Sequence, residues 1–89
     1  MTYKVIFSKR FDKQFSKLDK FTQKLILNWI EKNLEETENP KQHGKALKGN
    51  LSGYWRYRIG DYRVIAEIID SELIILMIDA GHRRKIYKN

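Results

Sequence analysis

The sequence predicts an α+β domain in which an N-terminal helical hairpin packs on an antiparallel sheet of about four strands. Apolar residues recur at helical spacing between residues 9 and 36, whereas from residue 54 to 80 they alternate with polar residues or run together. A β-branched and aromatic stretch at residues 2–7 precedes the helices, so the expected order is β-α-α-β-β-β. At 89 residues the chain has room for one domain, placed over residues 1–89.

Two capping residues mark the starts of the predicted helices. Ser8 precedes the first apolar positions, and Asp19 precedes the second helix, which runs to about residue 36. Leu27 falls off the apolar stripe of the second helix and is expected to touch a partner. The residues predicted to reach the core from the two helices are Phe11, Phe15, Leu18, Phe21, Leu25, Trp29, Ile30 and Leu34.

The second half of the chain reads as a loop followed by strands. Asn39-Pro40 ends the second helix because the residue before a proline avoids the helical region. Residues 40–53 contain three glycines and are predicted to form a loop with a short central turn. Strands are expected at about 54–59, 62–69 and 72–80.

Alternating aromatic and basic residues form the most informative stretch, YWRYRIGDYR. A two-residue turn at Gly60-Asp61 places Arg58 opposite Arg63 and Arg56 opposite Ile65. Three guanidinium groups then share one face of two neighbouring strands. Like charges directly across a hairpin destabilise it, so this arrangement indicates a site for an anion.

The same register divides the sheet into two faces. One face is apolar and is expected to lie under the helices. The other is basic at one end and apolar at the opposite end, where Ile74, Leu76 and Ile78 gather. Another protein or a second copy of the chain could cover this apolar end. A fold of the C-terminal tail or of the 40–53 loop over it is about equally compatible with the sequence.

Composition narrows the classes of function. The formal net charge is +7, which favours a polyanionic partner, either nucleic acid or an acidic protein. The absence of cysteine excludes disulfides, thiolate chemistry and a CxxC metal site. No apolar run is long enough to span a bilayer and the N-terminus is polar again by Ser8, so we expect a cytoplasmic protein without a membrane partner.

Basic residues interleaved with aromatic ones are typical of nucleic-acid binding. Arg56, Arg58 and Arg63 are predicted to hold a phosphodiester, and the C-terminal tail is predicted to bring His82 to the same edge as a group that titrates near neutral pH. Tail residues Arg83 and Tyr87 are expected at that edge, and the further residues predicted to bind RNA or the ribosome are Lys45, Lys48, Tyr54, Arg84 and Lys85.

Acidic residues are too scattered to predict a metal site, and no cofactor motif occurs. Glu67 is the only carboxylate predicted on the basic face, where we expect it to pair with an arginine. Cleavage of nucleic acid would then proceed without metal, by attack of an RNA 2′-hydroxyl on the adjacent phosphate.

The segments KALKGNLSGYWRYRIGDYRVI and GHRRKIY, with a hydrophobic strand between them, resemble the RelE toxins of bacterial type II toxin–antitoxin modules. The resemblance covers essentially the whole chain. It implies a RelE-like α+β fold and a ribosome-dependent mRNA endonuclease (an mRNA interferase) that cuts in the 30S A site. It also implies a cognate acidic, RelB-like antitoxin, through which alone the complex would bind operator DNA.

The resemblance further implies roles for individual residues. Arg63 matches an arginine that stabilises the phosphate, Arg83 the general acid for the leaving 5′-oxygen, and Tyr87 a tyrosine that orients the substrate. Arg56 and Arg58 stand where the best-known members have lysine. Because an arginine does not lose its proton, His82 becomes the better candidate for proton transfer.

Two other functions fit the same fold. A ParE-like toxin inhibits DNA gyrase and has no nuclease activity, and an inactive module could retain only RNA or antitoxin binding. The basic set and the Arg83/Tyr87 tail favour the endonuclease, but fold does not fix function.

Overall fold

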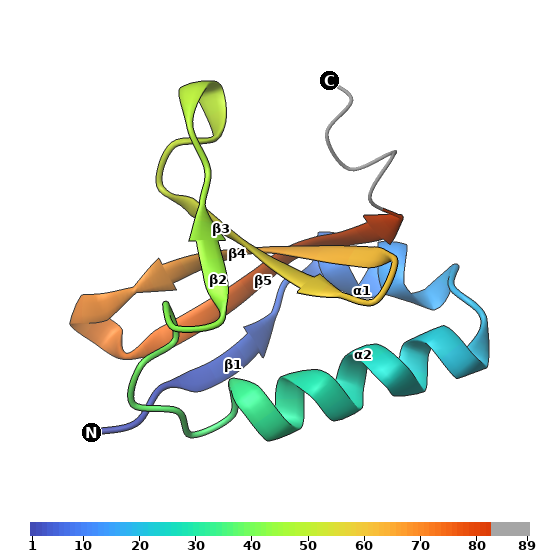
Figure 1. The fold of residues 1–89 in the computed structure, drawn as a ribbon, viewed down its shortest axis with the longest axis horizontal. Coiled ribbons are helices and arrows are strands. Elements are labelled where there is room, and N and C mark those ends of the chain that lie inside the picture. The colour runs from blue at the N-terminus through green and yellow to red at the C-terminus, as the bar shows by residue number, and fades with distance from the viewer. Residues whose placement is uncertain (83–89) are drawn as a thin grey trace.

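The structure, a computed structural model, describes residues 1–82 as two helices beneath one mixed sheet (Figure 1). The predicted α+β class with its N-terminal helical hairpin is confirmed, but the sheet has five strands, in the order β1-β5-β4-β3-β2. The elements are β1 (Lys4–Phe7), α1 (Lys9–Ser16), α2 (Lys20–Asn33), β2 (Gly44–Ala46), β3 (Tyr54–Ile59), β4 (Tyr62–Ile69) and β5 (Ile74–His82), with 3₁₀ turns η1 (Gly49–Leu51) and η2 (Asp70–Glu72).

Two strand pairings account for the differences from the prediction. β1 pairs parallel with β5, because the helical hairpin carries the chain across one face of the sheet before it returns. The predicted loop at 40–53 contains β2, a three-residue edge strand that pairs antiparallel with β3. A strand this short, reading GKA, has no alternation that the sequence pattern could reveal.

Both helices begin at the predicted caps. The Ser8 hydroxyl oxygen accepts a hydrogen bond from the Phe11 amide at 3.0 Å. The Asp19 carboxylate accepts one from the Thr22 amide at 3.2 Å and another from the Thr22 hydroxyl at 2.6 Å. The bonds from the Phe11 and Thr22 amides satisfy groups that have no partner within the helix.

Helix α2 presents a different face to the sheet than the sequence predicts. Thr22, Ile26, Ile30 and Leu34 are buried, whereas Phe21 is 78% exposed and Leu25 is 42% exposed. The prediction that Phe21 and Leu25 lie in the core is therefore wrong. The inward stripe begins with a threonine, whose hydroxyl is satisfied by the cap and which can therefore be buried without an orphaned polar group.

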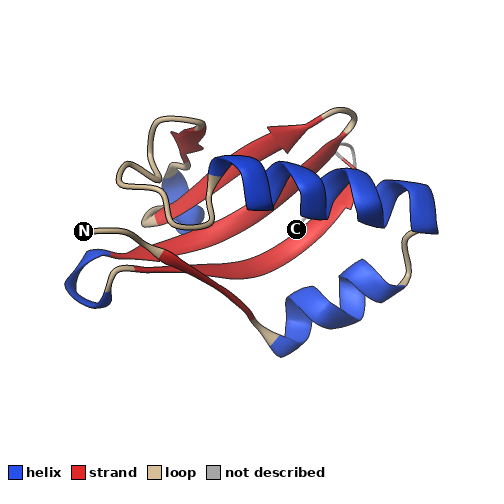
Figure 2. Ribbon diagram, turned by 90° about the horizontal axis from the view of Figure 1, so that it is seen from below, coloured by secondary structure: helices blue, strands red, loops and turns tan. Residues whose placement is uncertain are grey.

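The helices cover only one face of the sheet, as the view in Figure 2 shows. On that face the sheet is apolar and packs under the helices, as the register predicts, although Trp55, Ile68 and Leu73, which were expected there, are only half-buried. A register shift in the β4–β5 ladder between Ile65 and Ala66 lets Asp79 and Met77 face successive residues, and it brings Ala80 opposite Val64 in the core. The sheet residues buried under the helices are Tyr57, Ile59, Val64, Ala66, Ile75, Met77 and Ala80.

Candidate nucleic-acid interface

The β3–β4 hairpin has the predicted register. Arg58 stands opposite Arg63 and Arg56 opposite Ile65. Gly60 in the turn has φ +60°, a left-handed conformation that glycine adopts without steric cost. Arg58 and Arg63 are therefore directly opposed in the folded sheet, as the turn predicts.

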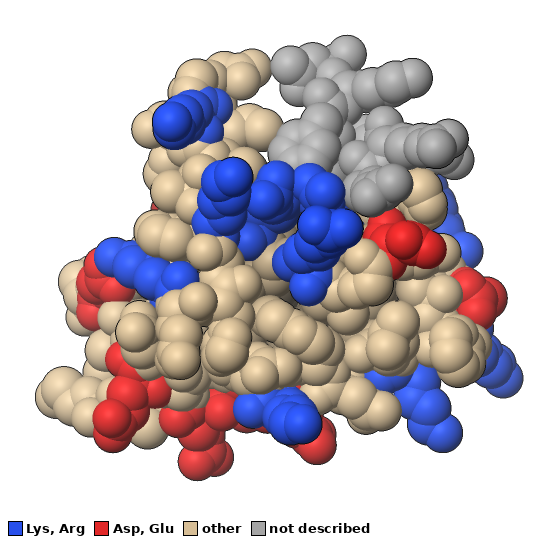
Figure 3. All heavy atoms as spheres, in the orientation of Figure 1, with Lys and Arg blue, Asp and Glu red and all other residues tan. Residues whose placement is uncertain are grey.

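The short strand β2 adds a fourth cation to this face. Lys45 lies opposite Arg56, so one row across three strands reads Lys45, Arg56, Ile65, and the next reads Arg58, Arg63. Figure 3 shows Lys and Arg gathered in the upper middle of the molecule. Lys45, Arg56, Arg58 and Arg63 are called the basic face below; Lys45 was predicted as an RNA contact, but its pairing with Arg56 was not.

The sheet fixes the backbone positions of these four residues, whose side chains differ in burial. Arg58 and Lys45 are exposed, whereas Arg56 and Arg63 are half-buried and Ile65 between them is 6% exposed. Half-buried guanidinium groups keep their charge, because arginine does not deprotonate in proteins, and each presents a planar fork of donors. The register therefore gathers several donors on one part of the sheet, where they could bind one anion.

Tyr54 and Glu67 form the next row on this face. Both side chains are half-buried. Within residues 1–82 the Glu67 side chain makes no hydrogen bond and no ion pair, so the expected pairing with an arginine is not found in that part of the chain. Lys48 lies farther out, in the exposed arm 47–53 that rises from the sheet (Figure 1).

His82 lies on the other side of the sheet from the arginines. It pairs with Tyr62, and the two rings meet edge to face with centroids 5.7 Å apart. Tyr62 packs against the core under the helices, and directly paired residues share a face. The strand end does approach the arginines, since Gly81 stands opposite Arg63. The predicted tail residues, Arg83, Arg84, Lys85 and Tyr87, lie outside the described residues.

Metal ligation finds no support in residues 1–82. No group of three or more His, Asp or Glu side chains comes close enough there to hold an ion. The same part of the chain has no helix that is long and apolar enough to cross a membrane.

Comparison with known proteins assigns the family. The family model of the ParE toxin of the type II toxin–antitoxin system parDE matches residues 5–87. The chain belongs to this toxin family. None of the curated proteins compared with the toxin matches it.

Solved structures agree with the assignment at the level of the fold. The toxin is similar to a chain of the RelBE2 toxin–antitoxin complex of Mycobacterium tuberculosis, with a TM-score of 0.84 and 24% identity over 93% of this chain and 100% of that one. It is similar to the archaeal RelE–RelB complex of Pyrococcus horikoshii OT3, with a TM-score of 0.69 and 27% identity over 96% and 99%. The isolated RelE toxin of E. coli gives 0.71 and 20% over 96% and 90%.

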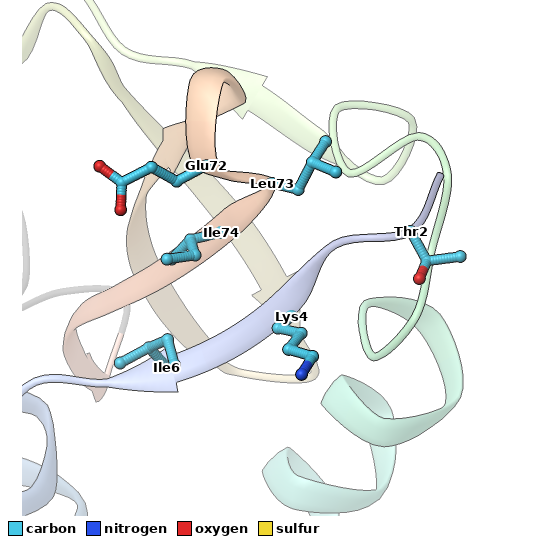
Figure 4. Close-up of a pocket in the computed structure, with 6 residues that line it drawn as sticks. All are labelled: Thr2, Lys4, Ile6, Glu72, Leu73 and Ile74. Atoms are coloured by element: carbon cyan, nitrogen blue, oxygen red, sulfur yellow. The ribbon is translucent and has the colours of Figure 1, made fainter.

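The apolar end of the same sheet face carries a hollow (Figure 4). Its volume is about 340 Å³, and Ile6 within it is 44% exposed. β1 and the turn into β5 form the walls of this hollow. The lining residues are Thr2, Lys4, Ile6, Glu72, Leu73 and Ile74.

A polar network closes the turn beside this hollow. The Tyr3 hydroxyl donates to an Asp70 carboxylate oxygen at 2.6 Å, and Lys41 reaches the other oxygen at 3.4 Å. The hydrogen bond from Tyr3 lowers the pKa of Asp70 and raises that of Tyr3. These exposed groups join the N-terminus to the β4–β5 turn and are separate from the basic face.

Proposed function

We propose that this toxin is a ribosome-dependent mRNA endonuclease that cuts in the A site and so inhibits translation. The observation that carries the proposal is the basic face, where four cations occupy two adjacent rows of one sheet. The substrate 2′-oxygen forms a bond to phosphorus as the bond to the 5′-oxygen breaks. One proton leaves the 2′-hydroxyl and one reaches the 5′-oxygen, which gives a 2′,3′-cyclic phosphate and a 5′-hydroxyl.

The arginines are suited to the charge that develops in this reaction. As the 2′-oxygen attacks, negative charge builds on the non-bridging oxygens of phosphorus. Arg56, Arg58 and Arg63, with Lys45 beside them, supply donors that are already oriented by the sheet. Preorganised donors of this kind act most strongly where charge appears only in the transition state.

Abstraction of the 2′-hydroxyl proton requires another group, because the protonated arginines of the basic face cannot act as a base. The resemblance to RelE toxins assigns the general acid to Arg83 and substrate orientation to Tyr87. His82 is the proposed proton-transfer group next to them. To reach a phosphate on the basic face, its ring would have to leave Tyr62 and pass the end of β5.

An acidic, RelB-like antitoxin is the proposed protein partner. The net charge of +7 favours an acidic chain, and the solved relatives from M. tuberculosis and P. horikoshii are toxin–antitoxin complexes. The hollow around Ile6 offers that chain an apolar contact. Operator DNA would be bound through the antitoxin.

Gyrase inhibition is the second candidate, and the match to the ParE toxin family favours it specifically. Such a toxin would use the same fold without cutting RNA. An inactive module that only binds RNA or antitoxin is a third possibility, which the arginines in place of lysines keep open.

One experiment separates these functions. The toxin is expressed in cells with a reporter mRNA, primer extension maps breaks, and plasmid supercoiling is followed in parallel. The proposal predicts breaks inside translated codons that disappear in Arg63→Gln and Arg83→Ala and persist in Lys24→Gln, a matched loss of charge on the exposed side of α2. Intact mRNA with relaxed or broken plasmid would establish the gyrase function instead.

A further inference from the structure

Glu67 is a carboxylate beside the basic face, and phosphate binding there gives it no role. It is half-buried on β4, between Tyr54 of β3 and Leu76 of β5, on the face that carries the arginines. No residue among 1–82 bonds to it or pairs with it. Its two oxygens are therefore available to a ligand that brings hydrogen-bond donors.

The spacing of the rows fits an RNA strand lying along β3. Tyr54/Glu67 is two residues from Arg56, which is two residues from Arg58, and each step is about 7 Å along a strand. This step is comparable with the length of one nucleotide in an extended chain. An RNA strand that runs along β3 with its phosphate on the arginines would therefore have a base at Tyr54 and Glu67.

The two side chains together provide what base recognition in single-stranded RNA requires. An aromatic ring supplies a stacking surface, and a group beside it reads the Watson–Crick edge. An ionised carboxylate only accepts hydrogen bonds. Guanine offers two adjacent donors, N1–H and the 2-amino group, whereas adenine and cytosine set a ring acceptor beside their amino group and uracil sets carbonyls beside its single N–H.

We propose that Tyr54 and Glu67 form a base-recognition subsite selective for guanine, next to the basic face. The ring of Tyr54 stacks on the base, and the carboxylate of Glu67 accepts from N1–H and the 2-amino group. This subsite rests on the proposed endonuclease function and adds to it the base that the toxin reads beside the scissile phosphate.

The test is a cleavage map of an mRNA with randomised codons on programmed ribosomes. Wild type is expected to show guanine enriched at one fixed position relative to the cut. Glu67→Gln should lower that enrichment at least about tenfold and shift it toward adenine, whose amino group and N1 match a carboxamide. Tyr54→Leu should weaken cutting at all sites, and Glu31→Gln, an exposed acid on α2, should leave the map unchanged.

Each outcome separates the subsite from the catalytic proposal. If wild type and Glu67→Gln cut with the same base preference, the subsite is wrong while the endonuclease stands. If the preference is unchanged and antitoxin binding weakens instead, Glu67 belongs to a protein interface and the inference is overturned. If wild type cuts no mRNA, the endonuclease proposal fails and the subsite with it. Circular dichroism of each variant establishes that it is folded.

Discussion

Arg58 and Arg63 face each other directly across the hairpin, and this pair was predictable from sequence. Register in a hairpin follows from its turn, and Gly60-Asp61 fixes the turn. The apposition costs folding free energy because like charges across a ladder repel. Replacing one of these arginines should therefore stabilise the fold and weaken the function.

Arg58→Gln tests this opposition. We expect the free energy of unfolding to rise by about 0.2–1 kcal/mol, because the repulsion is removed at an exposed site. Cleavage on programmed ribosomes should fall about 10²-fold, the scale of losing one preorganised donor. Urea denaturation and single-turnover cleavage measure the two effects.

Lys24→Gln serves as the control, since it removes one charge from an exposed helical position. It should change neither quantity appreciably. A variant Arg58→Gln that is less stable than wild type and cuts at the wild-type rate would contradict both the repulsion and the clamp.

Gly44 is a second residue whose role is readable only in the structure. A Cβ atom placed there would lie 2.8 Å from Cε1 of the buried Tyr57 ring and 3.3 Å from the Arg56 carbonyl oxygen. The ring cannot retreat easily, because its hydroxyl donates to the Pro40 carbonyl at 2.5 Å. Close approach of β2 to β3, and hence the position of Lys45, therefore requires glycine.

Gly44→Ala is expected to lower the free energy of unfolding by about 1–3 kcal/mol, as overpacking of a closed site does. Gly81→Ala is the matched control, since a Cβ there has no neighbouring atom within 4 Å. Thermal melts followed by circular dichroism compare the two. Equal stability of both variants would show that β2 can move away from Tyr57 without loss of stability, which contradicts the requirement for glycine.

At the scale of elements, helix starts were predictable and helix facing was not. Ser8 and Asp19 cap by short-range hydrogen bonds that sequence encodes locally. The buried face of α2 depends on packing against β3, and Thr22 takes a place in the stripe that a hydrophobicity pattern gives to Phe21. Phe21 and Leu25 are instead exposed on α2, and Leu27 is exposed as its place off the predicted stripe indicates.

The Asp19 cap gives α2 a pH-dependent contribution to stability. Hydrogen bonds from the Thr22 hydroxyl and amide lower the pKa of Asp19. The folded state therefore binds the proton less readily than the unfolded state. The stabilisation is complete above the ordinary value of 3.8 and is lost as pH falls through the lowered value in the folded state.

Asp19→Ala should lower the free energy of unfolding at pH 7, because the amide and hydroxyl of Thr22 lose their acceptor. Asp19→Asn keeps the cap and does not titrate, so it should lie near wild type at neutral pH and lose less stability than wild type on acidification. Urea titrations at pH 7 and below pH 4 provide the comparison. Parallel pH profiles for wild type and Asp19→Asn would exclude this carboxylate as a source of acid lability.

At the scale of the whole molecule, the directions and neighbours of β1 and β2 lay beyond the sequence pattern. Alternation reports which residues share a face but not which strand lies alongside. β1 reads like any strand, yet its parallel place beside β5 follows from the path of the helical hairpin. Lys45 and His82 show the consequence. Lys45 lies on the basic face because β2 pairs with β3, and His82 lies on the helix side because it pairs with Tyr62.

Net charge attracts RNA to the whole molecule. The salt dependence of RNA affinity distinguishes this general attraction from binding at the basic face. The chain carries +7, spread over helices and sheet, but only the basic face should neutralise phosphates of a bound single strand. Four such contacts predict that log K for a short RNA falls with log salt with a slope of about −3, since each contributes about 0.7.

Lys45→Gln should make that slope shallower by about 0.7, because it removes one phosphate contact. Lys24→Gln removes the same charge from α2, away from the basic face, and should leave both the slope and the affinity nearly unchanged. Fluorescence anisotropy of a labelled RNA in increasing KCl measures both. If the two variants shift the slope equally, RNA is attracted by net charge alone, and the four cations of the basic face do not form a site.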